Sequence, residues 1–494
     1  RAAATQRKAD QGPDPHPDLE VRTECAASLL CLGSEAGTPW LLAVLRIDTD
    51  EAERRGEQLT TSETTAWPRG RAAEVLCAYL GLEHRVWTDA SLETRAAKAL
   101  ELEALGFDVT TGLGDSFVRT KAEAEYGVVR DGVGGYGVVG VLRNGPGPTL
   151  MIRTDTDALP VAERTGLPYA SQQVDMTWTG VTNGVMHACG HDIHMPSWIG
   201  TARRLANDRE SWSGTLVMIA QPAEELGLGA LAMLNDGLFE RFPVPDYNLA
   251  LHVDAALPAG QVAFISGFAM ANVDSVDITL KGVGGHGAYP HLARDPIAAG
   301  AALITSLQTL VSRNVDPQRP GVVTVGSFQA GAKHNIIPGT AKLLLTVRSY
   351  DDETRATLLD GIRRIAEGQS AAFGLEPPEI FIEPDGTPAV YNDPQLAERT
   401  RQVAIAALGA DRVAEKDPVM GGEDFARYGR TVEDIPGVLF WLGAVPPDLY
   451  ARAQNGPLPL PSLHSPFFAP DYQPAIQTGT ETMTRLALDL LQTP

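Results

Sequence analysis

The sequence has few cysteines, no long apolar run and no apolar segment near its first residue. Its 494 residues include 4 cysteines, Cys25, Cys31, Cys77 and Cys189, too few and too scattered for a disulfide framework. No apolar run reaches the roughly 18 residues of a membrane span. Residues 1–17 lack the apolar centre of a secretory signal, although a chain that begins with Arg leaves a trimmed N-terminus open. We therefore expect a reducing compartment, with the cytoplasm as the expected location, and no membrane partner.

Positive charge is also in short supply. Lys and Arg total 40 against 62 Asp and Glu, which gives a formal net charge of -22. A field of this sign repels phosphate backbones and anionic membrane surfaces, so we expect no nucleic-acid partner. Net charge does not report on a site, so the function has to come from local patterns.

The remaining composition is that of a folded globular protein. Hydrophobic residues make up 44% and charged residues 21% of the chain, and its length predicts two to four domains at roughly 150 residues each. We expect an N-terminal extension of unknown role, a main domain in two parts and an inserted domain. The expected boundaries are 1–66 for the extension, 67–268 and 385–494 for the main domain, and 269–384 for the insertion.

Apolar strands and helices alternate along the first part of the main domain. This alternation predicts an α/β fold with an open, mostly parallel sheet that is covered on both faces, and ligands bind such sheets beyond the carboxyl ends of the strands. The predicted strands are 149–153, 214–220 and 248–253, and the predicted helices are 91–105, a helix from after His194 to 206, and 229–236. The glycine-rich segment 112–135 is interpreted as an inserted loop.

Gly132, Gly134 and Gly137 have the spacing of a dinucleotide-binding fingerprint. That motif must follow a strand and open a helix, whereas here it leads into the strand pattern of residues 138–142. We interpret it as a loop that enters a strand.

The insertion has a pattern of its own. Its predicted order is βαββαβ over about 110 residues, which is the ferredoxin-like, split βαβ arrangement. The predicted strands are 276–281, 322–328, 342–348 and 379–382, and the predicted helices are 295–313 and 353–373.

Metal-ligand residue types gather at three successive strand ends of the main domain. Cys189 and His191 lie in the segment 186–194, Glu224 and Glu225 follow the strand that ends near Ala220, and His252 follows the next one. Each alone has an ordinary alternative: a hydrogen-bonded histidine, a buried apolar cysteine, or a solvated helix start. Because all three lie on the edge where such a sheet builds its site, we predict a metal centre, whose N, S and O donors suit Zn, Mn, Co or Ni rather than Mg.

At this point the sequence resembles a known family, the amidohydrolase branch of the M20 metallopeptidases. That branch includes N-acyl-amino-acid amidohydrolases, hippurate hydrolases and plant auxin-conjugate hydrolases. The resemblance runs from about Ser91 to the C-terminus and rests on five ordered segments. These are Asp155-Thr156-Asp157-Ala158-Leu159-Pro160, His187-Ala188-Cys189-Gly190-His191-Asp192, Gln221-Pro222-Ala223-Glu224-Glu225, Gly284-Gly285-His286-Gly287-Ala288 with Pro290-His291, and Gly422-Glu423-Asp424-Phe425.

The resemblance implies a role for each candidate residue. Two divalent metal ions are expected on five ligands, Cys189, His191, Glu225, His252 and His464. Glu224 matches the general base that takes a proton from the attacking water and passes it to the leaving amine. Asp157 resembles a carboxylate that orients the ligands from outside, with Asp155 and Asp192 as further candidates.

The resemblance also makes the insertion a lid and dimerisation domain, with a homodimer as the expected assembly. His286 is expected to reach the partner subunit's site, whereas Asn335 and Arg348 resemble groups that hold the substrate carbonyl and carboxylate. The implied activity is cleavage of an N-acyl amino acid into a carboxylate and a free amino acid.

Two alternatives remain open at this point: a dipeptidase or carboxypeptidase that uses the same site, and a binding protein without turnover.

The chain departs from the family pattern in several places. Thr88-Asp89-Ala90-Ser91 stands where relatives carry His-Pro-Glu, Gly422 stands where Ser is common, and Leu463 stands where Asn often precedes the His. Residues 1–66 and the segment 115–131 have no counterpart. None of these departures removes a ligand, so we expect an active enzyme.

Overall fold

The computed structural model describes residues 101–117, 120–121, 137–176, 182–454, 456 and 460–492. The predicted N-terminal extension, the start of the predicted helix 91–105 and two of the three fingerprint glycines, Gly132 and Gly134, lie outside the described residues. None of the described helices is both long enough and apolar enough to cross a membrane.

The larger sheet has eight strands in the order β1-β2-β6-β3-β7-β18-β8-β17. Their bounds are β1 Asp108–Leu113, β2 Gly137–Asn144, β6 Gly214–Gln221, β3 Thr149–Asp155, β7 Tyr247–Pro258, β18 Gly437–Val445, β8 Val262–Phe264 and β17 Val413–Glu415. The four central strands β6, β3, β7 and β18 are parallel to one another, and antiparallel strands extend the sheet on both sides. The predicted mostly parallel sheet is therefore confirmed.

Register decides which side chains meet at the carboxyl ends of the central strands. Asp155 of β3 pairs with Gln221 of β6, and Arg153 pairs with Ala250 of β7. His252, two residues after Ala250, therefore lies level with Asp155, because both strands run in the same direction.

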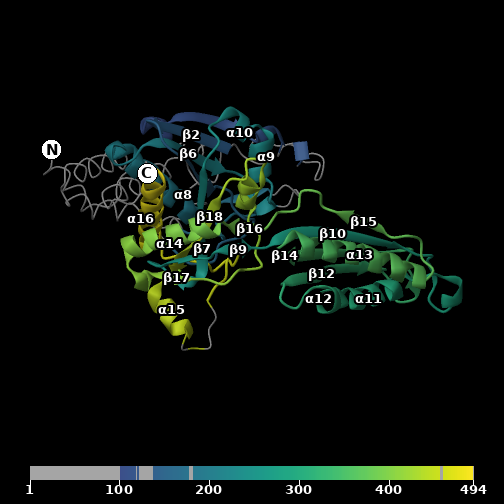
Figure 1. The fold of residues 1–494 in the computed structure, drawn as a ribbon. Helices are drawn as coiled ribbons and strands as arrows, with labels where there is room; N and C mark the ends of the chain where they lie inside the picture. Colours follow the sequence, from purple (N-terminus) through teal and green to yellow (C-terminus); the bar gives the residue numbers. More distant parts are fainter. Residues whose placement is uncertain are drawn as a thin grey trace.

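Helices bury both faces of this sheet (Figure 1). The helices α8 His191–Asn207, α14 Pro394–Leu408 and α16 Tyr472–Leu490 supply the apolar side chains on one face. The helices α9 Gly229–Asn235 and α10 Leu238–Arg241, with the 3-10 segment η6 Asp424–Arg430, supply those on the other. The helix α15 Pro447–Gln454 follows β18.

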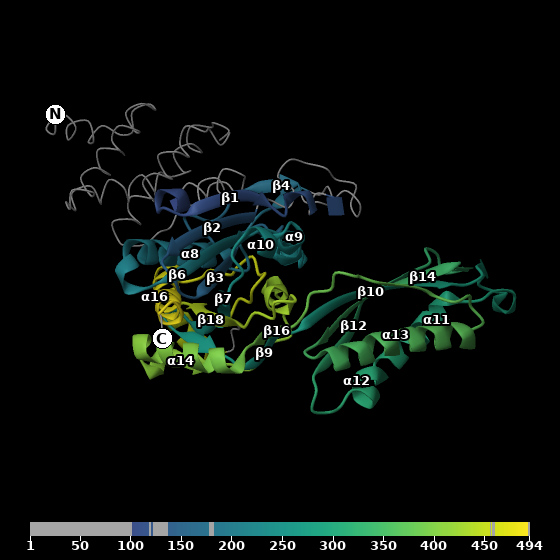
Figure 2. The ribbon, with the colours of Figure 1, turned by 45° about the horizontal axis from the view of Figure 1, so that its top comes forward.

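A second, antiparallel sheet lies beside the first (Figures 1 and 2). Its order is β12-β14-β10-β15, with β10 Asn272–Lys281, β12 Gly321–Ala330, β14 Thr340–Ser349 and β15 Glu379–Ile382. The helices α11 Pro296–Leu307, α12 Thr309–Asn314 and α13 Asp352–Ala372 pack on one face and form a core made of residues from 276–382 alone. Asp295 and Asp351 accept backbone N–H groups at the starts of α11 and α13.

The chain leaves for the second sheet and returns from it at one place. The Val273 N–H donates to the Thr387 carbonyl at 2.8 Å, so the outgoing and returning segments are hydrogen-bonded neighbours. Three further pairs of short strands lie outside the two sheets: β4 Val174–Met176 with β5 Thr182–Gly184, β9 Gly267–Met270 with β16 Val390–Asn392, and β11 Gly285–His286 with β13 Ile336–Ile337.

Three local predictions are wrong. Gly112 belongs to the edge strand β1, and residues 115–117 are helical, so the predicted loop 112–135 is not a loop throughout. The helix expected from after His194 begins at His191, because Gly190 takes a left-handed φ of 78° that starts it earlier. The single helix expected at 295–313 is divided at Gln308 into α11 and α12.

Candidate metal centre

The five predicted metal ligands lie together at the carboxyl ends of β3, β6 and β7. Cys189 and His191 flank Gly190 at the start of α8, Glu225 lies in the 3-10 turn η3 Glu224–Leu226 after β6, and His252 lies within β7. His464 comes from the loop before α16, and its N–H donates to the Ala188 carbonyl at 2.9 Å. One backbone hydrogen bond thus brings the most distant ligand in the sequence to the first.

Their donor atoms form a continuous chain of short separations. The Cys189 Sγ lies 3.5 Å from the His252 Nε2 and 3.3 Å from the His464 Nε2. The Glu225 Oε2 lies 3.6 Å from the same His464 nitrogen, and the Glu225 Oε1 lies 3.9 Å from the His191 Nε2. Since 54% of the His464 side chain is exposed and the other histidines are buried, this edge of the cluster is open to solvent.

The residues fit a divalent metal. The His191 Nε2 and the Glu225 Oε1 are buried and have no hydrogen-bond partner among the described residues, yet they face each other. The other ring nitrogens are fixed by backbone carbonyls: the His191 Nδ1 donates to Asp157 at 2.9 Å, and the His252 Nδ1 donates to Val253 at 2.7 Å. This arrangement turns both Nε2 atoms toward the cluster, as in metal-binding histidines.

Electrostatics in the cluster favour a thiolate. Burial alone would raise the pKa of the Cys189 thiol, but the adjacent His252 ring and hydrogen bonds from the histidines lower it to about 4. Burial would lower the pKa of His252, but the same thiolate raises it to about 9. Burial and the thiolate together raise the pKa of Glu225 to about 8. Without an ion, therefore, part of the charge compensation in this cluster comes from bound protons.

Glu224 lies next to the cluster and is buried. Its Oε2 is 3.8 Å from the His191 Nε2, and its pKa is raised by burial and by the nearby carboxylates of Glu423 and Asp424. Ala223, with a left-handed φ of 53°, turns the backbone so that Glu224 and Glu225 both face the cluster. A buried carboxyl that holds a proton more readily than usual can both take up and deliver a proton.

The three predicted outer carboxylates differ in what they contact. The Asp157 Oδ2 accepts the Glu225 N–H at 2.9 Å, and its Oδ1 lies 3.4 Å from the His191 Nδ1. Asp155 accepts the His194 Nδ1–H at 2.7 Å and lies 3.7 Å from the His191 Nε2. The Asp192 Oδ1 is buried with no hydrogen-bond partner among the described residues, and burial raises its pKa to about 7.

His286, Asn335 and Arg348 all belong to the second sheet and its loops. The Asn335 carbonyl accepts the Gly287 N–H at 2.9 Å, so Asn335 lies beside His286 in the β11–β13 ribbon, and both are exposed. Arg348 lies at the other end of β14, where its Nε donates to the Thr346 hydroxyl at 3.1 Å. No hydrogen bond or ion pair joins any of the three to the ligand cluster within the described part of the chain.

Sequence reasoning missed a buried polar network behind the cluster. Arg153 is 2% exposed and bonds to carboxylates and an amide, and His194 is satisfied on both nitrogens because its Nε2 accepts the Val253 N–H at 2.9 Å. One signal was present: Arg153 follows the apolar run Leu150-Met151-Ile152 of β3, and a charged side chain in a buried strand needs partners.

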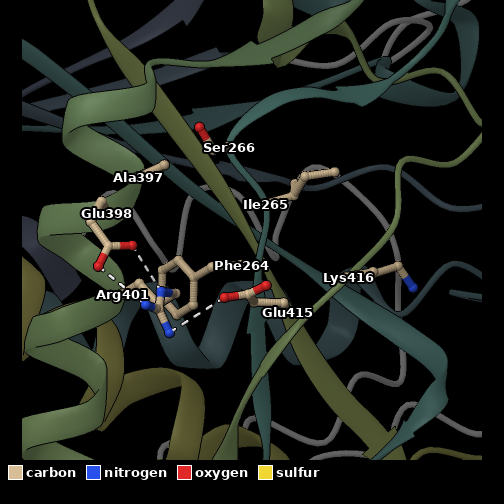
Figure 3. Close-up of a pocket in the computed structure, with 8 residues that line it drawn as sticks. All are labelled: Phe264, Ile265, Ser266, Ala397, Glu398, Arg401, Glu415 and Lys416. Atoms are coloured by element: carbon tan, nitrogen blue, oxygen red, sulfur yellow. Dashed lines mark hydrogen bonds and ion pairs between the residues drawn. The ribbon is translucent and has the colours of Figure 1, made fainter.

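A separate hollow of about 200 Å³ lies at the ends of β8 and β17 (Figure 3). Figure 3 shows Arg401 between two carboxylates; its Nε lies 2.9 Å from Glu398 and its Nη1 3.7 Å from Glu415. Because these charges neutralise one another and none belongs to the ligand cluster, the hollow is not part of the candidate metal centre.

Comparison with known sequences shows the family to which the chain belongs. Residues 151–486 match the profile described as peptidase family M20/M25/M40. N-acetylcysteine deacetylase of Bacillus subtilis is 37% identical over 348 residues, which are 70% of this chain and 83% of the relative. N-acetyldiaminopimelate deacetylase of Streptococcus thermophilus is 39% identical over 298 residues, which are 60% of this chain and 74% of the relative.

Comparison with solved structures gives the same result. The YXEP protein of Bacillus subtilis, described as a dinuclear metal-binding peptidase of the M20 family, superposes with a TM-score of 0.61 at 30% identity. The match covers 81% of this chain and 92% of that one. The similarity therefore includes the region of the candidate centre.

Proposed function

Since the chain belongs to peptidase family M20/M25/M40 and is a hydrolase of that family, we propose that it is a binuclear metal-dependent amidohydrolase that cleaves N-acyl amino acids. The products are a carboxylate and a free amino acid. The observation that carries the proposal is the cluster of one thiolate, three imidazoles and one carboxylate with the unligated Glu224 carboxyl beside it. Two relatives are named for the removal of acetyl groups from amino acids, which supports this substrate class.

Cys189, His191, Glu225, His252 and His464 would hold the ions, as Zn, Mn, Co or Ni. Ions bound there would lower the pKa of a water molecule and would polarise the amide carbonyl. Glu224 takes the proton as the water attacks the carbonyl carbon, and then delivers it to the amine nitrogen as the C–N bond breaks. Asp157 keeps the His191 ring in place throughout, because its backbone carbonyl accepts the Nδ1–H.

We further propose that residues 269–384 are a lid and dimerisation domain, inserted between catalytic segments 67–268 and 385–494. The ten-residue strands β10 and β14 lead away from the first sheet, and the β11–β13 ribbon follows their far ends. At about 3.3 Å per residue this is a reach of roughly 30 Å, so His286 and Asn335 act in the site of a partner subunit. Exposed apolar side chains around them, Val283, Tyr289 and Ile336, support burial against a second copy.

Arg348 has a different place in this proposal. It lies at the near end of β14, and its planar guanidinium suits the substrate carboxylate.

Glu224→Gln tests the chemistry. The amide keeps the shape of the side chain but cannot take the proton, so we expect unchanged metal content and a turnover reduced about 10²- to 10⁴-fold. Hippurate, N-acetyl amino acids and simple dipeptides are compared as substrates, each with the metal-stripped protein reconstituted with Zn, Mn, Co or Ni. Retained turnover in the variant contradicts the assignment of the base, and preferential cleavage of dipeptides contradicts the substrate class.

Mixing subunits tests the lid. Glu224→Gln and His286→Ala should each be inactive as homodimers. In a heterodimer of the two, one site keeps its own Glu224 and receives an intact His286 from its partner. Activity should therefore return on mixing, and its absence would show that His286 does not act across a subunit interface.

A further inference from the structure

We propose that Glu423 and Asp424 are positioning residues that hold the Glu224–Glu225 turn in place, Glu423 through the buried Arg153 and Asp424 by direct hydrogen bonds, and that they bind no metal ion. The inference rests on the proposed function, because it assigns the Gly422-Glu423-Asp424-Phe425 segment a part in that same site. The segment opens η6, which lies on the sheet face at the carboxyl ends of β3 and β6.

The first step concerns charge. Glu224, Glu423 and Asp424 bring three buried carboxylates within 4.8 Å of one another, an arrangement that by composition resembles a cation site. The cation is already there: the Arg153 Nη2 donates to the Glu423 Oε1 at 2.7 Å, and its Nη1 donates to the Glu423 Oε2 at 3.2 Å. This two-bond pairing of guanidinium and carboxylate gives both oxygens of Glu423 a positively charged partner, so the carboxylate needs no metal ion for charge compensation.

The remaining donors of Arg153 extend the network. Its Nη1 also donates to the Asp155 Oδ2 at 2.8 Å, its Nη2 to the Asp424 Oδ1 at 3.2 Å, and its Nε to the Gln221 Oε1 at 3.1 Å. All five N–H groups of a fully buried guanidinium are thus used. One side chain therefore ties the end of β3 to the end of β6 and to η6.

The second step concerns the turn that carries Glu224 and Glu225. Asp424 fixes it at both ends, because its Oδ1 accepts the Gln221 Nε2–H at 2.6 Å and its Oδ2 accepts the Ala230 N–H at 2.9 Å. Between these points the backbone is strained at Ala223, a non-glycine residue with a left-handed φ of 53°, and Gly227 reaches a φ of 66° without that cost. A strained turn keeps its shape only where its surroundings determine it, and here the acidic pair does so.

The third step concerns the direction of the Glu224 side chain. Its carboxylate receives no hydrogen bond from the described residues, so no donor fixes where it points. Glu423 and Asp424 each bring a carboxylate oxygen within 4.8 Å of it, and the His191 Nε2 lies 3.8 Å from its Oε2. Like charges repel, so the acidic pair directs Glu224 toward the ligand cluster and away from η6. Glu423→Gln removes one repelling charge and adds an amide N–H that Glu224 can accept, which draws the base out of position.

The test compares Glu423→Gln and Asp424→Asn with wild type, and Asp351→Asn is the matched control. Asp351 also accepts a backbone N–H and a side-chain hydroxyl, both from Thr354. It lies at the start of α13, the helix that packs on the second sheet, and so is outside the ligand cluster. In both test variants we expect unchanged metal content, a KM within about twofold of wild type and a kcat lowered about 10²-fold, because a small misplacement of a reacting group has that effect. The control should keep both kinetic constants.

A second measurement does not depend on turnover. In the metal-free protein, amide hydrogen exchange across residues 223–230 should be faster in Asp424→Asn than in wild type, and unchanged in the control. A lower metal content in either variant would show that Glu423 or Asp424 is a metal ligand and would overturn the proposal. An undiminished kcat, or unchanged hydrogen exchange in Asp424→Asn, would also overturn it. If wild type hydrolyses no substrate in the panel, the proposed function fails, while exchange at 223–230 still decides whether the network holds the turn. If Glu423→Gln does not fold, Asp424→Asn carries both measurements.

Discussion

Gly190 separates two candidate ligands, and a methyl group at this position should disturb both. Its φ is 78°, and an added Cβ would lie 2.4 Å from the Val253 Cγ2. A non-glycine residue at such a φ costs about 1–2 kcal/mol, and forcing a methyl group into a filled site adds about 1–3 kcal/mol. We therefore expect Gly190→Ala to lower the free energy of unfolding of the metal-free protein by about 2–5 kcal/mol. Relief of the clash moves Cys189 and His191 relative to His252, which precedes Val253, so metal affinity should fall at least about tenfold.

Gly145→Ala is the control that separates the two contributions. Gly145 has a φ of 84°, and nothing lies within 4 Å of a Cβ built on it, so its substitution carries the backbone cost alone. Urea unfolding of the metal-free proteins gives both changes in stability, and a competition titration against a chelator gives metal affinity. If the two variants lose equal stability and Gly190→Ala binds metal as tightly as wild type, then the close approach of Gly190 to Val253 does not hold the ligands in place.

Three further outcomes follow from the structure. With pKa values of about 8 for Glu225 and about 9 for His252, both groups hold a proton at pH 7 in the metal-free protein, and the pKa of the ligand His191 is also raised. Metal binding should therefore release at least about two protons. Metal affinity should then rise as pH increases toward 9, and calorimetry in buffers of different ionisation enthalpy would measure the number of protons released. A metal affinity that does not change with pH would contradict these pKa shifts. Asp351→Ala should cost about 1 kcal/mol, because Asp351 caps α13 by accepting the Thr354 N–H. Burial would raise the pKa of Asp351, but that hydrogen bond lowers it. The stabilisation should therefore be present above the ordinary carboxyl pKa and be lost as pH falls through the lowered pKa of Asp351. Urea unfolding at a series of pH values would show this loss. Removing metal should lower the melting temperature, and restoring it at 100 times its Kd should stabilise the protein by about 2.7 kcal/mol, whereas equal melting temperatures would exclude a resident ion.

The sequence predicted the parts of the fold that local patterns determine. The central strands β3, β6 and β7 and the strands of the second sheet follow from apolar runs and alternation, and the elements found agree with them to within a few residues. The start of α8 was misplaced because it depends on a left-handed glycine, Gly190, and nothing in the pattern of apolar residues distinguishes that glycine from one in a loop.

The network around Arg153 could not be predicted because its partners are far apart in the chain. An Arg in an apolar strand indicates that partners exist but not which ones, and here Glu423 lies 270 positions away. Four of the ligands, in contrast, were recognisable because metal-ligand residue types occur near successive strand ends, which meet at one edge of a parallel sheet. His464 was expected only from the resemblance to the family. The predicted lid residues His286, Asn335 and Arg348 lie on loops and strand ends of the second sheet, and what they contact in an assembly stays a prediction.

The central position of β18 determines the order in which the molecule can be completed during synthesis. This strand, residues 437–445, lies between β7 and β8, which precede it by more than 170 residues. A growing chain therefore exposes an unpaired edge of β7 until the ribosome has made residues 437–445, and His464 emerges later still. Residues 276–382, whose core contains only their own side chains, can collapse before that. Truncation between residues 382 and 437 would leave a chain with one finished core, one open sheet edge and an incomplete ligand set, a form that aggregation and proteolysis would remove.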